Sequence, residues 1–310
     1  MLLPFSQNTW SAIIKDKISV VNATLEYKNL SGALSKTATQ LQNYYIGVDT
    51  YQQLVIHWGS GVPNDTAEEK LLTQSLDALQ RSMLNFALAD SLIYLIAHIG
   101  NDGITVRKTD DETTIYKYQQ DQLKEQLLDD AHFWLSRLLE LLASNKTVFP
   151  SYAQEVGLTQ NFNKPEFDWL RPAFRLYMGI DDDSFFRYNQ GLICDNVATL
   201  YARLTGEELG HIPQIPAAAQ RAFVYSTVAD VLESSPYANL PKVLRNEFQS
   251  ELIKNKDLSE QQIRMQKAEF WRRKAEPLWQ VVEKSQVKNT IRSIYNSPKP
   301  NKNSKHTFTI

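Results

Sequence analysis

Two long segments near the middle of the chain carry apolar residues at helical spacing. The first, residues 70–99, repeats them every three or four positions: Leu72, Leu76, Leu79, Met83, Phe86, Ile93 and Ala97. The second, residues 119–144, does the same with Leu123, Leu127, Ala131, Trp134, Leu138 and Leu142. This spacing places apolar side chains on one face of a helix. We therefore predict two amphipathic helices that pack together at the centre of a mainly α-helical bundle.

Residues 103–118, between these helices, carry the strongest strand signal in the chain. Two short β-prone runs, around Ile104 and around Ile115, flank an acidic turn at 109–113, a pattern typical of a β-hairpin. An isolated hairpin is only marginally stable, so we expect this one to lean on the helices or to pair with another chain. The residues expected to make these contacts are Ile104, Val106, Asp110, Asp111, Ile115 and Tyr116.

The segments around the central helices predict shorter helices. Residues 1–65 are expected to form an N-terminal helical segment that is interrupted at Gly47, and residues 66–256 the core of the bundle. Thr66 and Glu69 have the spacing of a capping box at the start of the first central helix. The rest of the core is predicted to contain a crossing loop at 149–164 and helices at 166–177, 184–204, 217–232 and 241–256.

The C-terminal part combines a polar helix with a basic tail. Residues 257–287 predict a long helix with Asp257 or Ser259 as its N-cap. Its apolar positions are sparse, which fits a protruding or partner-packed helix better than a core helix. These positions are Ile263, Phe270, Leu278 and Val281.

Residues 288–310 contain no acids, and their lysine, proline and asparagine content predicts a flexible, extended, basic arm. Two interpretations of this arm stay open. It is either a solvated end, or a segment that orders on an acidic surface or a nucleic-acid backbone. In the second case the contact residues are Lys288, Arg292, Lys299, Lys302, Lys305, Phe308 and Ile310.

Composition narrows the class of protein. The apolar fraction of 43% and charged fraction of 22% over 310 residues are ordinary for a globular chain with a sizeable core. The net charge of −2 gives the whole chain no electrostatic bias toward nucleic acid or membrane. Cys194 is the only cysteine, so no disulfide forms within the chain. We expect no signal peptide and no transmembrane segment.

Acidic residues and histidines, which are catalytic or metal-binding in many proteins, are expected to have structural roles in this chain. Asp181–Asp183 lacks the spacing of a calcium loop and is expected to cap a helix. The histidines are scattered without a zinc-binding motif, and we expect His98 and His132 to be buried, hydrogen-bonded residues of the two central helices. Asp90 is unusual within an apolar helix and is expected to face a rim or to pair with Arg81 or Lys124. We predict no catalytic residue, no cofactor and no metal.

The order of motifs in the central region resembles a known group. The stretches IGNDGITV, TTIYKYQQDQLKEQLL, FWLSRLLELLASNKTVFPSY and FDWLRPAFRLYMGI follow one another between Ile99 and Ile180. This region resembles a family of uncharacterised proteins of tailed bacteriophages and prophages of Bacteroidetes, which are suspected head-to-tail connector (neck or adaptor) proteins. The resemblance covers roughly residues 76–232, and its motifs are structural rather than catalytic.

The resemblance implies a virion structural protein that is assembled in the host cytoplasm and is not an enzyme. Such adaptors form rings, usually dodecameric, beneath the portal. By this analogy, the partners are other copies of the chain, the portal protein, tail or other neck proteins, and non-specifically the DNA in the channel. The basic arm would dock on the portal, and the hairpin would contact the next subunit or the tail.

Two alternatives remain. One is another virion or assembly protein, such as cargo ejected with the genome or a capsid-associated factor. The other is a helical enzyme, which would need converging acids and histidines, for example around Asp90, His98 and His132.

Overall fold

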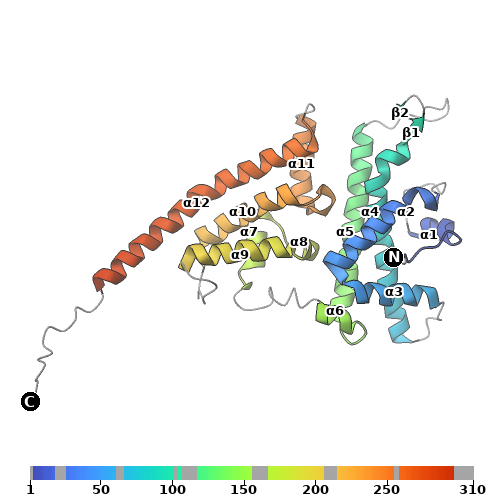
Figure 1. The fold of residues 1–310 in the computed structure, drawn as a ribbon, viewed down its shortest axis with the longest axis horizontal. Helices are drawn as coiled ribbons and strands as arrows, with labels where there is room; N and C mark the ends of the chain where they lie inside the picture. The colour runs from blue at the N-terminus through green and yellow to red at the C-terminus, as the bar shows by residue number, and fades with distance from the viewer. Residues whose placement is uncertain are drawn as a thin grey trace, which may run out of the picture. The chain divides into compact units, whose positions relative to one another are not determined.

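The computed structural model describes residues 3–17, 26–60, 66–100, 103–106, 117–155, 167–205, 215–254 and 258–296. Helices account for most of these residues, as the sequence predicts (Figure 1). The chain divides into two compact units. Unit 1 comprises Met1–Lys164, Ile180–Gln190 and Ser235–Glu247, and unit 2 comprises Pro165–Gly179, Gly191–Ser234 and Phe248–Ile310.

Unit 1 is built on two long helices, α4 (Ala67–Ile96) and α5 (Lys117–Ser144), which pack along each other in opposite directions (Figure 1). Their facing side chains are fully buried and are mainly Leu, Met and Ala. The Ser82 hydroxyl of α4 also donates to the Ala131 carbonyl of α5 at 3.1 Å. The predicted central pair is therefore confirmed, and its boundaries lie within about three residues of those expected.

The N-terminus of α4 has the predicted capping box. The Glu69 carboxylate accepts from the Thr66 amide at 2.8 Å, and the Thr66 hydroxyl accepts from the Glu69 amide at 3.1 Å. Two amides that lack helical partners are thereby satisfied, which starts the helix where the sequence predicts.

Shorter helices surround the central pair in unit 1. They are α1 (Trp10–Lys17), α2 (Tyr27–Leu41), the π-helix η1 (Gln42–Ile46), α3 (Val48–Ser60) and α6 (Pro150–Glu155). The predicted break at Gly47 is confirmed, because Gly47 has φ 82° and ψ 161° between η1 and α3. This backbone conformation is essentially restricted to glycine. The crossing loop expected from residue 149 is helical at its start, where α6 lies.

The predicted hairpin of residues 103–118 is not supported. Two four-residue strands, β1 (Ala97–Gly100) and β2 (Gly103–Val106), pair antiparallel with Ile99 opposite Ile104. Of the expected second strand, Ile115 and Tyr116 lie outside the described residues, and Tyr118 lies in the first turn of α5, which begins at Lys117. The β-prone residues at 115–118 predicted a strand, but the last two of them, Lys117 and Tyr118, are the first residues of the 28-residue amphipathic helix α5.

Unit 1 is completed by two segments distant in sequence. These are α8 (Asp183–Tyr188) and, from residue 235 on, η4 (Tyr237–Asn239) with the start of α11 (Lys242–Lys254). The Asp182 carboxylate accepts from the Ser184 amide at 2.9 Å and caps α8, which confirms the capping role predicted for the acidic triplet. The single helix expected at 184–204 is interrupted at Asn189.

Unit 2 contains α7 (Leu170–Met178), α9 (Gln190–Thr205, from Gly191 on), α10 (Ala217–Ser234) and α12 (Glu260–Asn296). Helix α12 runs antiparallel along α10, since Arg264 donates to the Leu232 carbonyl and Trp279 to the Ser226 hydroxyl. Ala222 and Ala229 of α10 are fully buried, and small side chains of this kind allow packed helices to approach closely.

Helix α12 differs from the prediction in two ways. It ends at Asn296 rather than near residue 287, so Lys288 and Arg292 are helical and not part of an extended arm. Of the four apolar positions that the sequence analysis named for this helix, Phe270 and Val281 are 44% and 57% exposed. Ile263, which was also among them, is buried, and the other buried residues of α12 are Ala268, Trp271, Ala275, Trp279 and Val282. Alanines and tryptophans on a charged helix therefore give α12 a core face that the sparse aliphatic pattern did not reveal.

In the described part of the chain, no helix combines the length and hydropathy that crossing a membrane requires.

Candidate functional site

Only some of the residues predicted to contact a partner are among those that the structure describes. Ile104 and Val106 lie on β2, whereas Asp110, Asp111, Ile115 and Tyr116 lie outside the described residues. The arm residues Lys299, Lys302, Lys305, Phe308 and Ile310 also lie outside them. The contacts expected of both groups stay predictions.

The three residues considered as a possible enzyme site do not share one cluster of described contacts. Asp90 is half exposed and pairs with Lys36 at 2.9 Å, so it faces a rim as predicted but with a different partner. Arg81, which was expected to pair with it, binds Asp77. His98 belongs to β1 and not to a central helix, which corrects its predicted position. His132 has the hydrogen-bonded role predicted for it.

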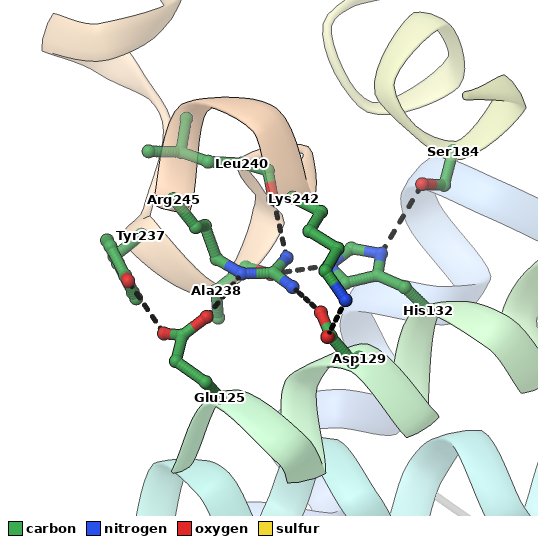
Figure 2. Close-up of polar contacts among 9 residues, drawn as sticks. All are labelled: Glu125, Asp129, His132, Ser184, Tyr237, Ala238, Leu240, Lys242 and Arg245. Atoms are coloured by element: carbon green, nitrogen blue, oxygen red, sulfur yellow. Dashed lines mark hydrogen bonds and ion pairs between the residues drawn. The ribbon is translucent and has the colours of Figure 1, made fainter. Parts of the chain in front are cut away.

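A polar cluster of unit 1, which we call the α5 clamp, consists of Glu125, Asp129, His132, Ser184, Tyr237, Lys242 and Arg245 (Figure 2). Glu125, Asp129 and His132 follow one another at i, i+4 and i+7 on α5, so they share one face of the helix. Figure 2 shows this face turned toward η4 and the start of α11, which supply the cationic and carbonyl partners.

Arg245 is the centre of the clamp, and its side chain is only 1% exposed. Its guanidinium donates to Glu125 at 3.0 Å, to Asp129 at 2.5 Å and to the Leu240 carbonyl at 2.8 Å. The Tyr237 hydroxyl donates to the other oxygen of Glu125 at 2.6 Å, and Lys242 pairs with Asp129. A buried guanidinium is stable only when its donors and its charge are satisfied, and both conditions hold here.

His132 extends the clamp to α8. Its Nε2 lies 2.8 Å from the Ala238 carbonyl, which only accepts, so Nε2 carries the proton. Nδ1 is then the acceptor for the Ser184 hydroxyl at 3.4 Å. Burial, aided by repulsion from Arg245, lowers the pKa of His132, while Asp182, the Ala238 carbonyl and Asp129 oppose the shift. The imidazole is therefore held neutral, as its two opposite hydrogen bonds require.

The chemistry of the α5 clamp is that of a structural lock. Its acids, cations and imidazole bond to one another or to backbone carbonyls, and this ties residues 235–247 to a helix more than 100 positions earlier. The sequence signal for it was the acid pair Glu125 and Asp129 at i, i+4, but nothing in the sequence indicated that Arg245 was their partner.

A surface cavity of about 390 Å³ lies elsewhere in unit 1, between α4 and α5 near the end of α1. Its lining includes Lys17, Asp77, Trp134 and Arg137. Lys17 pairs with Asp77, and the Arg81 guanidinium stacks 4.8 Å from the centre of the Trp134 ring. The charged groups at this cavity are thus already engaged in pairs and a cation–π contact. Among the described residues, no group of three or more His, Cys, Asp or Glu side chains is arranged to hold a metal ion.

Two exposed surfaces of mixed apolar and charged character remain. One, called the α12 strip, consists of Phe270, Arg273, Lys274, Val281 and Lys284, which are all exposed. Positions that are three, four, seven or eleven residues apart in sequence lie on the same face of a helix. These five residues have such spacings and therefore lie along one side of α12. The Lys274 ammonium lies 4.5 Å from the centre of the Phe270 ring.

The second surface, called the η1–α8 patch, consists of Tyr44, Val48, Asp49, Asp181 and Asp183, also exposed. It forms where α8 packs against η1: the Tyr44 and Tyr188 rings lie 4.8 Å apart, and Arg187 donates to the Tyr45 carbonyl at 3.2 Å. Tyr44 and Val48 are 48% and 44% exposed. The exposed side chains named here are thus one aromatic, one aliphatic and three acidic, and Arg187 of α8 belongs to the same contact between α8 and η1.

Comparison with known proteins gives one match. A model described as a family of unknown function (DUF6712) matches residues 43–161. This range runs from η1 through α6 and includes the central pair α4 and α5, whereas α8, η4 and α11 of the clamp lie beyond it. No curated protein and no solved structure matches the chain.

Proposed function

We propose that this protein is a structural component of a tailed-phage particle, a head-to-tail connector. Copies of the chain associate in a ring between the capsid portal and the tail. Their partners are one another, the portal protein and tail or other neck proteins. The chain contributes shape and binding surfaces and carries out no bond-making step.

The observation that carries the proposal is the division of charge between the two units. Unit 1 contains 22 acidic and 16 basic side chains, a net charge of −6, and unit 2 contains 13 acidic and 17 basic ones, a net charge of +4. The total of −2 conceals this asymmetry. Opposite charge on two parts of one chain favours association of unit 1 of one copy with unit 2 of another, and head-to-tail association of this kind forms a ring when the rotation between copies closes.

Two further features support the proposal. In the order of its motifs, the central region resembles a family of uncharacterised tailed-phage proteins that are suspected head-to-tail connectors. The charged side chains of the α5 clamp bond to one another and to a backbone carbonyl, and these contacts hold unit 1 together.

The proposal is tested on the particle. Purified virions of a phage that encodes the chain should contain it at a fixed ratio to the portal, and cryo-electron microscopy should show it as a ring at the neck. Light scattering of the purified protein should give a mass that is a multiple of one chain. If the protein is absent from particles, the proposal fails. If it lies inside the head without a fixed ratio to the portal, it is ejected cargo or a capsid factor.

A further inference from the structure

We propose that the α5 clamp opens in acid: protonation of His132 releases the segments Ile180–Gln190 and Ser235–Glu247 from α5, while the packing of α4 against α5 is kept. The inference does not depend on the proposed function. It begins with the path of the chain, because both segments belong to unit 1 although the residues before and after each of them belong to unit 2. Each segment is therefore held in unit 1 by its contacts and not by its neighbours in sequence.

His132 bonds to both segments from one position on α5. Its Nε2 donates to the Ala238 carbonyl of η4 at 2.8 Å, and its Nδ1 accepts from the Ser184 hydroxyl of α8 at 3.4 Å (Figure 2). The two segments are also joined to each other, since the Ser235 hydroxyl donates to the side-chain oxygen of Asn189 at 2.6 Å. We therefore expect them to leave α5 together.

The charges around the imidazole are already balanced. Its own helix, the start of α8 and the start of α11 contribute charged groups: Glu125, Asp129, Asp182, Lys242 and Arg245. The two acids of α5 pair with the two cations of α11, and the Asp182 carboxylate accepts from the amide that it caps. From α4, the Phe86 ring lies nearly perpendicular to the imidazole, with ring centres 5.1 Å apart. A second proton on His132 therefore adds a positive charge beside the Arg245 guanidinium, where the carboxylates are already paired.

Protonation also reverses the hydrogen bond at Nδ1. This nitrogen accepts from Ser184 in the neutral ring but becomes a donor in the imidazolium, so the bond that holds α8 in its present form is lost. The pKa of His132 is lowered by burial and by the neighbouring Arg245, as this arrangement requires. When the segments leave α5, the ring meets water and its pKa returns to about 6.5. Acid therefore favours the released form.

The central pair of helices does not share this dependence on pH. The side chains that α4 and α5 bury against each other are mainly Leu, Met and Ala, which do not titrate. Parts of one protein can open locally at a lower free energy than the whole requires. We therefore expect acid to open the clamp and to leave the pair packed.

The experiment is hydrogen exchange of the full-length chain, read by mass spectrometry at pH 7.0 and pH 5.5 and corrected for the intrinsic exchange rate. Amides of residues 235–247 should exchange several-fold faster at pH 5.5. The limit is about eightfold, for a ring with a pKa of about 6.5 when released that stays neutral when bound. Peptides from residues 76–89 of α4 and 127–139 of α5 should change less than about twofold over the same interval.

Variants identify the proton that is responsible. His132→Gln keeps a donor for the Ala238 carbonyl but does not titrate, so residues 235–247 should exchange equally at the two pH values. The matched control is His57→Gln, which removes a histidine bonded to Thr73 at 2.9 Å outside the clamp and should keep the full acid response.

A second variant tests the same bond without removing the histidine. Ser184→Ala removes the hydroxyl that donates to Nδ1 and keeps the backbone amide that Asp182 caps. Because only the neutral ring accepts this bond, the variant should exchange faster than the wild type at pH 7.0 and should show a smaller ratio between the two pH values.

Three results overturn the inference. The first is exchange of residues 235–247 that is no faster at pH 5.5 than at pH 7.0. The second is an acid response that persists in full in both His132→Gln and Ser184→Ala. The third is exchange that rises equally in α4 and α5, which would mean that acid unfolds the whole unit and does not open the clamp alone.

Discussion

Arg245 is the single residue on which most of the α5 clamp depends, since its guanidinium neutralises two carboxylates of α5 in a nearly water-free position. Arg245→Met is expected to destabilise the fold by about 3–5 kcal/mol, because Glu125 and Asp129 lose their buried partner. Lys242→Met is the matched control: it also removes a cation from Asp129, but Lys242 is 64% exposed, and its loss is expected to cost less than about 1 kcal/mol.

Urea denaturation with a constant slope measures both changes. Equal midpoints for the Arg245 and Lys242 variants would mean that the guanidinium is solvated and that the clamp does not hold residues 235–247 in place.

His132 makes the same cluster sensitive to acid. The pKa of His132 is lowered in the folded state, whereas in the unfolded chain it is ordinary, about 6.5. Below that pH the unfolded state binds a proton more readily than the folded state. The contribution of His132 to the free energy of unfolding is therefore fully present above about pH 6.5 and is lost as the pH falls from there toward the lower pKa of the folded state. The variant His132→Gln should show a shallower loss of stability between pH 7 and pH 5, measured by chemical denaturation at each pH. An identical slope in the variant would assign the acid sensitivity to other groups.

The ion pairs that the sequence did not predict join residues that are far apart along the chain. Asp90 lies 54 positions from its partner Lys36, and Arg245 lies 116 positions from Asp129. Pairs of this kind depend on how helices pack, which no local pattern encodes. The contacts that were predicted correctly, the Thr66–Glu69 capping box and the cap at Asp182, span two or three residues, over which backbone geometry alone fixes the distance.

At the scale of elements, the joint between η1 and α3 depends on one glycine. Gly47 has a φ of 82° and a ψ of 161°, and its amide closes the π-helix on the Gln42 carbonyl at 3.1 Å. Gly47→Ala is expected to destabilise the protein by about 1–3 kcal/mol, since a side chain makes this conformation unfavourable. The matched control is Gly32→Ala within α2, where an added Cβ meets no atom within 4 Å; it should stabilise by about 0.5–1 kcal/mol.

Thermal unfolding of both glycine variants checks this expectation. A Gly47 variant as stable as the wild type would show that the joint adopts another conformation, and the position of Tyr44 and Val48 in the η1–α8 patch would then need to be reconsidered.

Hydrophobic periodicity predicted long elements well and short ones poorly. The helices α4 and α5 each repeat their pattern over many turns, so local noise averages out, and they lie where expected. The hairpin rested on two runs of three or four residues, too few to distinguish a strand from the first turn of a helix. The packed face of α12 was missed for a related reason: it is made largely of alanine and tryptophan, which an aliphatic pattern does not detect.

At the scale of the whole molecule, Val282 is the last buried residue of α12 among those whose side chains the structure describes, which end at Ser285. A chain that ends at Val287, and so lacks residues 288–310, is expected to melt within about 2 °C of the full chain, because it retains every described buried residue of α12. It should nevertheless assemble poorly, since the basic residues predicted to bind a partner are gone.

The matched control for this truncation is a chain that ends at Leu278. It also loses Trp279 and Val282, of which the first donates to Ser226 at 3.1 Å and carries the Arg203 guanidinium 4.7 Å from its ring centre. Removing a buried tryptophan costs about 3–5 kcal/mol, so this shorter chain should melt several degrees lower. Differential scanning calorimetry separates the two chains, and light scattering follows their assembly. If the chain ending at Val287 melts as low as the shorter one, residues 288–310 belong to the packed fold; if it assembles like the full chain, they are not a docking arm.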